Sequence, residues 1–80
     1  MCPEGFIGLP GDGFQDDLGP SYKPGFEQCS KDCLERINCH SFRYGFNDKY
    51  CTLMKKKVPE FTFTEQEYQF CAKAGKFRTL

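Results

Sequence analysis

The chain has 80 residues, which allows one small domain, and a chain of this length buries only about 60–65% of the surface that its unfolded form exposes. Its 11 basic and 11 acidic residues cancel, which argues against general nucleic-acid binding, because such domains are usually strongly basic. No apolar run approaches the roughly 18 residues of a membrane-spanning helix, so we expect no direct membrane insertion. A core this thin predicts an additional covalent constraint, and six cysteines can supply it.

The even number of cysteines is typical of proteins from an oxidising compartment. We expect no signal peptide at the start of this sequence, because Cys2, Pro3 and Glu4 follow Met1 directly. We therefore interpret Met1 as an added start codon and the chain as a domain of a longer secreted or extracellular protein. The alternative is a complete cytosolic protein with reduced or metal-bound thiols.

Residues 3–25 are rich in glycine and proline, which predicts turns and short extended segments instead of a helix. The apolar side chains expected to point inward from this region are Phe6, Ile7, Leu9, Phe14 and Leu18. Residues 26–36 predict the one helix, because Pro24 and Gly25 precede them and no helix breaker falls inside. The apolar stripe expected on this helix consists of Phe26, Cys29, Cys33 and Ile37, with Leu34 beside them.

After the helix the hydrophobic period changes to two, which predicts a half-buried strand over residues 40–46 and a second strand over 50–54. The turn at 47–49 joins them into a hairpin, and 61–64 and 67–73 predict further short strands. This order predicts a small disulfide-rich α+β domain with an antiparallel sheet packed on one helix. The core expected between helix and sheet consists of Phe26, Leu34, Phe42, Tyr44 and Leu53, and the aromatic side chains expected to be exposed are Tyr22 and Tyr50.

The positions of the cysteines limit how they can pair. Cys29 and Cys33 lie one turn apart on one helical face, where they are poorly placed to bond each other. Cys39 follows the helix end, where the chain can fold back, and Cys51 lies on the second strand of the hairpin. Six cysteines allow fifteen pairings, and sequence alone does not choose among them. This geometry favours the pairs Cys33–Cys39, Cys29–Cys51 and Cys2–Cys71.

These segments resemble the PAN/apple module. Its pattern, C-x3-C-x5-C-x-x-F-x-Y followed by C-x-L, is matched by Cys29, Cys33, Cys39, Phe42, Tyr44, Cys51 and Leu53. Cys71 is similar to the extra cysteine of apple-type members, which pairs with the first cysteine. The resemblance covers residues 2–72 and leaves residues 73–80 as a C-terminal tail. It implies a mostly antiparallel sheet around one central helix, and the same three disulfides.

The resemblance also implies a function. PAN and apple modules are non-catalytic binders of proteins or carbohydrates, so we expect a monomeric adhesion domain, one repeat of a larger secreted or surface protein. Its partner would be a protein receptor or a cell-surface glycan. The chain looks similar to the microneme adhesins of apicomplexan parasites, which implies host-cell attachment. The alternatives are a structural spacer repeat without a ligand, the apple domain of a clotting-type protease that binds a protein, and a small protease inhibitor that uses the loop at 55–60.

From the residue types we expect no catalytic residue, no bound metal ion and no cofactor. His40 is the only histidine, which excludes a site that needs two, and it follows Cys39 directly at the start of a strand, as an ordinary exposed histidine would. The cysteine spacing lacks the paired C-x2-C motifs of common zinc modules, and no phosphate-binding glycine loop is present.

The one cluster of like charge is Lys55–Lys57, on a loop after the second hairpin strand. We expect an anionic ligand to be held there by Lys55, Lys56 and Lys57, with Arg43 or Lys76 assisting. Lys73 joins this group if the last strand lies nearby. The alternative is a solvated loop that keeps the hairpin edge from pairing with other chains.

Overall fold

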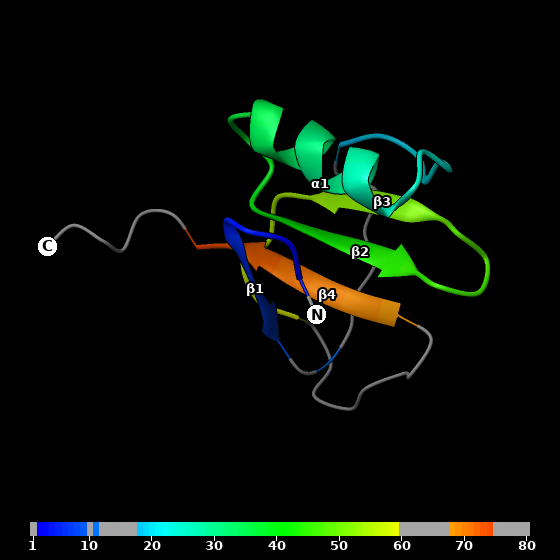
Figure 1. Ribbon diagram of the computed structural model, residues 1–80. Helices are drawn as coiled ribbons and strands as arrows, with labels where there is room; N and C mark the ends of the chain where they lie inside the picture. The colour runs from blue at the N-terminus through cyan, green and yellow to red at the C-terminus, as the bar shows by residue number, and fades with distance from the viewer. Residues whose placement is uncertain (1, 10, 12–17, 60–67, 75–80) are drawn as a thin grey trace, which may run out of the picture.

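The computed structural model describes residues 2–9, 11, 18–59 and 68–74. Within these residues one helix covers an antiparallel sheet whose strand order is β1-β4-β2-β3. The elements in chain order are β1 (Phe6–Leu9), α1 (Phe26–Glu35), β2 (Ser41–Gly45), β3 (Cys51–Met54) and β4 (Tyr68–Lys73). Figure 1 shows α1 lying across β2 and β3, while β4 and β1 extend the sheet away from the helix. The predicted disulfide-rich α+β fold class is confirmed.

Helix α1 begins and ends where the backbone permits. Gly25 has a φ of 97°, a conformation that glycine adopts at little cost, and Glu27 lies in the first turn near the positive end of the helix dipole. Arg36 is already extended, so the helix ends at Glu35, one residue before the predicted end. The buried face of α1 consists of Cys29, Ser30 and Cys33.

Three disulfides connect the helix and the N-terminal segment to the sheet, and they join the same pairs that the sequence favours. Cys29–Cys51 connects α1 to β3, and Cys33–Cys39 connects α1 to the segment that leads into β2. Cys2–Cys71 connects the N-terminal segment to β4. No cysteine is free.

The main core lies between α1 and the sheet, and Phe42 is its centre. Phe42 is 0% exposed, and its ring meets the Phe6 ring edge-on with the centroids 4.9 Å apart. Phe26 approaches Phe42 from α1 at 6.0 Å, and Tyr44 and Leu53 are buried beside them. Four of the five predicted core residues therefore pack as expected: Phe42, Tyr44 and Leu53 are buried, and Phe26 is partly buried against them.

Leu34 and Ile37, which the apolar stripe placed in the core, are exposed. Leu34 is 49% exposed because it follows Cys33 by one residue and so projects about 100° away from the buried face. Ile37 is 92% exposed because α1 has ended two residues before it, so the helical period no longer applies.

A second, smaller core covers the other face of the sheet. The strand predicted over residues 40–46 is therefore present as β2, but the prediction that it is half-buried is wrong. Ser41 and Gly45, which the period of two placed outward, are both buried. Met54, Phe70 and Ala72 form this second core with Leu9 against them, and the Ser41 hydroxyl donates to the Lys56 carbonyl at 2.7 Å. The strand ends at Gly45, and Phe46 is exposed.

The N-terminal region fits its predictions in part. Phe6 is buried and Leu18 packs partly buried against the core, but Ile7 is exposed because it lies on an edge strand and faces away from α1. Tyr22 is half-buried instead of exposed, because its hydroxyl donates to Asp32 on α1 and its backbone pairs with Cys51. Tyr50 is exposed as predicted. Phe14, Lys76 and the strand predicted at 61–64 lie outside the described residues.

Candidate functional site

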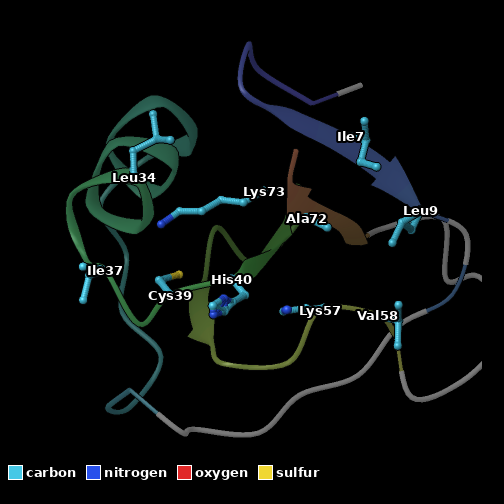
Figure 2. Close-up of a pocket in the computed structure, with 10 residues that line it drawn as sticks. All are labelled: Ile7, Leu9, Leu34, Ile37, Cys39, His40, Lys57, Val58, Ala72 and Lys73. Carbon is cyan, nitrogen blue, oxygen red and sulfur yellow. The ribbon is translucent and has the colours of Figure 1, made fainter. Parts of the chain in front are cut away.

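A groove of about 650 Å³ opens at the end of the sheet where β4 stops, β2 begins and the chain leaves α1. Figure 2 shows side chains from β1, the end of α1, β4 and the segment after β3 converging on it. Its volume lies within the range of sites that hold small molecules or short segments of a partner. Its apolar lining consists of Ile7, Leu9, Leu34, Ile37, Val58 and Ala72, and the remaining lining residues are Cys39, His40, Lys57 and Lys73.

The antiparallel sheet explains why these residues meet. Lys73 on β4 lies opposite Phe6, and its backbone N–H donates to the His40 carbonyl at 2.9 Å. The His40 N–H in turn donates to the Met54 carbonyl at 2.9 Å, which brings the lysine-containing segment after β3 to the same end. The Cys33–Cys39 disulfide holds the end of α1 beside these strands. The sequence therefore places both the apolar and the basic side chains at one end of the molecule.

Among the residues that the structure describes, most of the exposed large apolar side chains line this groove. Six large hydrophobic side chains are exposed among the described residues, and four of them line it: Ile7, Leu34, Ile37 and Val58. Single exposed hydrophobic residues are ordinary on a protein surface, whereas a contiguous group marks a site of interaction.

The groove also carries positive charge. The Lys73 ammonium donates to the Arg36 carbonyl at 3.0 Å, where a cation is favourable because α1 ends there. Lys57 is exposed, and Figure 2 shows its amine directed toward the side of the groove where His40 lies. No carboxylate is present among the lining residues. The polar character of the groove is therefore basic.

The predicted group of ligand-binding residues is divided in the structure. Lys57 and Lys73 line the groove together, as expected if the last strand lay nearby, whereas Lys55 is exposed but does not line it. Lys56 is half-buried with its Nζ buried, so it does not fit a solvated loop. Arg43 lies elsewhere, with its guanidinium 3.7 Å from the centre of the Tyr68 ring.

The cluster around Arg43 fixes the β2–β3 hairpin. Asp48 accepts hydrogen bonds from the Tyr50 N–H at 3.0 Å and from the Tyr68 hydroxyl at 2.9 Å. These bonds, the Tyr50 N–H foremost, hold the pKa of Asp48 below its usual value, and the bond to Asp48 raises the pKa of Tyr68. Lys23 lies over the Tyr50 ring, 4.8 Å from its centre. These contacts connect β2, β4 and the β2–β3 turn at the other end of the sheet from the groove.

Sequence reasoning missed most of the groove because it assigned Ile7, Leu34 and Ile37 to the core. Ile37 would not have been assigned to the core if α1 had been expected to end at Glu35, because residues after a helix no longer follow the helical repeat. Val58 beside the lysine run had no pattern to identify it. Among the described residues no cluster of histidine, cysteine or acidic side chains could hold a metal ion, and no helix is long and apolar enough to cross a membrane.

Comparison with known proteins places most of this chain in one family. The family model described as PAN domain matches residues 15–74. No curated protein and no solved structure matches the chain. The matched segment contains α1, β2, β3 and β4 with the disulfides Cys29–Cys51 and Cys33–Cys39, whereas β1 and Cys2 precede it. The groove thus combines residues of the matched segment with Ile7 and Leu9 from outside it.

Proposed function

Because the chain belongs to the PAN domain family, whose members are non-catalytic modules that bind proteins or carbohydrates, we propose that it is an extracellular adhesion module that recognises a protein partner through the groove. The observation that supports this proposal most is the concentration of exposed Ile7, Leu34, Ile37 and Val58 in one concave site. A disulfide-rich domain of this family suits the secretory pathway and the cell surface. Within this proposal the domain is one repeat of a larger protein.

The chemistry of the groove favours a protein over a neutral sugar. A neutral sugar presents many hydroxyls and a ring face that packs on an aromatic side chain, whereas His40 is the one aromatic lining residue and the lining has no carboxylate or side-chain amide. Aliphatic side chains of a protein partner, in contrast, lose water favourably against Leu34 and Val58. Such an anchor surrounded by polar groups is the usual anatomy of a protein interface.

Selection from a peptide library displayed on phage, with the domain as the target and a glycan array in parallel, tests this proposal. We expect selected peptides to bind wild type and to lose at least tenfold in affinity for the double variant Ile37→Ser/Val58→Ser. Both residues are exposed, at 92% and 63%, so the variant should fold normally. Tyr50→Ser, which removes an exposed apolar side chain at the hairpin, is the matched control. Peptides that bind the double variant as well as wild type would contradict the proposal.

A second candidate is an anionic glycan, supported by the exposed lysines at the same end of the molecule, Lys55 and Lys57, with Lys73 nearby. Here the ligand would be held by Lys55 and Lys57, with Lys76 assisting, whereas the buried Nζ of Lys56 removes that residue from the set that the sequence predicts. Heparin binding that falls steeply with salt and disappears in the variant Lys55→Ala/Lys57→Ala would favour this candidate. A domain that binds neither peptides nor glycans would be a spacer repeat. Attachment to host cells and association with a clotting-type protease both require a protein or glycan partner. The residues that flank this domain in the full-length protein would distinguish these two roles, because they would show either further repeats or a protease domain.

A further inference from the structure

The basic side chains in the groove bear on the kind of protein segment that it can hold. A partner chain that inserts an aliphatic side chain brings its neighbouring residues close to Lys57 and Lys73, because these lysines line the same cavity as Val58 and Ala72. A basic residue in that position would face two ammonium groups with no lining carboxylate to offset them. An acidic residue there would face complementary charge at both.

The two lysines are placed differently, which assigns them different roles. The Lys73 ammonium donates to the Arg36 carbonyl, which holds its positive charge beside the end of α1 and within the groove. Lys57 is exposed at the rim, opposite α1, on the segment that continues into Val58.

Resting on the proposed function, we infer that the groove is specific for an acidic, aliphatic peptide segment, in which a leucine-like side chain fills the apolar floor and a neighbouring carboxylate pairs with Lys57 and Lys73. The floor consists of aliphatic side chains, and the charges at its rim are all positive. Lys57 determines the sign of the charge that the groove accepts, and the apolar side chains determine that it accepts a protein segment.

Three fluorescein-labelled decapeptides test this inference by fluorescence anisotropy at 150 mM NaCl: one alternates leucine with glutamate, one leucine with lysine and one serine with glutamate. We expect the leucine–glutamate peptide to bind at least tenfold more tightly than the other two, and this binding to weaken at 500 mM NaCl because exposed charges are screened. The variant Lys57→Glu should lose at least tenfold for the leucine–glutamate peptide and gain affinity for the leucine–lysine peptide.

Lys55→Glu is the matched control, because it makes the same change of charge two residues away at an exposed position that does not line the groove. It should change each affinity by less than threefold. If Lys55→Glu acts as strongly as Lys57→Glu, the effect is one of net charge and the inference is overturned.

The remaining outcomes separate this inference from the proposed function. Equal binding of both leucine peptides, lost in Ile37→Ser/Val58→Ser, would overturn the acidic preference and keep the groove as a protein site. The acidic preference would also be overturned, and the groove kept as a protein site, if neither leucine peptide bound while phage-selected peptides still lost affinity for the double variant. Failure of both tests would overturn both. If the domain sediments with vesicles of phosphatidylserine and phosphatidylcholine in a way that depends on Lys57, the occupant is a membrane surface and the peptide inference is overturned. Nuclear Overhauser contacts between Phe77 and Val58 in the free domain would overturn it in favour of the chain's own C-terminal segment.

Discussion

Replacing Phe42 with alanine should destabilise the domain by about 3–5 kcal/mol, which is a large part of the net stability of a domain of this size. Phe42 is 0% exposed, so its truncation loses the transfer energy of a fully buried side chain, about 1.5–3 kcal/mol. The cavity left between Phe6 and Phe26 adds to that cost, because Cys29–Cys51 and Cys33–Cys39 limit how far α1 can close onto the sheet. The change is therefore expected near the upper end of this range.

Guanidinium denaturation followed by circular dichroism measures the effect, with disulfides intact and the slope of the transition compared between variants. Phe46→Ala is the matched control, because Phe46 touches the same cluster, 5.6 Å from Phe26 between ring centres, but is 47% exposed. It should cost about 1 kcal/mol, since half of its surface is already in water. Equal losses for Phe42→Ala and Phe46→Ala would refute the register assigned to β2, in which Phe42 faces α1.

Three further outcomes follow from specific contacts. Peptide mapping without reduction should recover Cys2–Cys71, Cys29–Cys51 and Cys33–Cys39, and a peptide that joins Cys29 to Cys33, or a free thiol, would contradict the fold. Asp32→Asn should lower the free energy of unfolding at pH 7. The hydrogen bond from the Tyr22 hydroxyl, assisted by Gln28, lowers the pKa of Asp32 in the folded state. The stability that ionised Asp32 contributes is therefore present above its unfolded-state pKa of about 3.9 and is lost as the pH falls through its folded-state pKa. The stability of variant and wild type should thus converge only below about pH 4, and a difference that persists unchanged to pH 2 would argue against this cause. Gly45→Ala should cost about 1–3 kcal/mol in the same denaturation assay, because its Cβ would collide with the Asp48 carboxylate and the Tyr68 ring, and a neutral effect would show that this hairpin contact is adaptable.

The fold was predictable from the sequence because its strongest signals agree. The change of hydrophobic period after Cys39 marks β2, and the Pro24–Gly25 pair marks the start of α1. The cysteines add a further constraint. Because the helical repeat places Cys29 and Cys33 on one face, where they are poorly placed to bond each other, each is expected to bond a cysteine outside the helix. These patterns are local, and local patterns can be read without knowing how the chain closes.

The groove was not predictable, because its residues come together only through long-range pairing. Ile7 meets Ala72 through the pairing of β1 with β4, and Val58 follows β3 at the end where these strands meet. Hydrophobic residues such as Leu34 are normally assigned to a core, and nothing in the sequence distinguishes a core leucine from one that lines an exposed groove. The sheet covered on both faces was missed for the same reason, since Ser41 and Gly45 carry the signature of an outer face while Lys56 and Tyr68 cover them.

Strand β1 should be the part of the fold that depends most on a single disulfide. It pairs only with β4 among the described strands and lies before the segment that the PAN domain model matches, whereas α1, β2 and β3 are held by the other two disulfides. Loop entropy gives about 4 kcal/mol for Cys2–Cys71, whose partners are 69 residues apart, against about 2 kcal/mol for Cys33–Cys39, whose partners are 6 apart. In the double variant Cys2→Ser/Cys71→Ser we expect hydrogen exchange to lose protection first at Phe6–Leu9, with β2 still protected, and peptide binding to fall because Ile7 and Leu9 leave the groove. Simultaneous loss of protection in β1 and β2 would show instead that the domain unfolds as one unit and that the groove has no separable half.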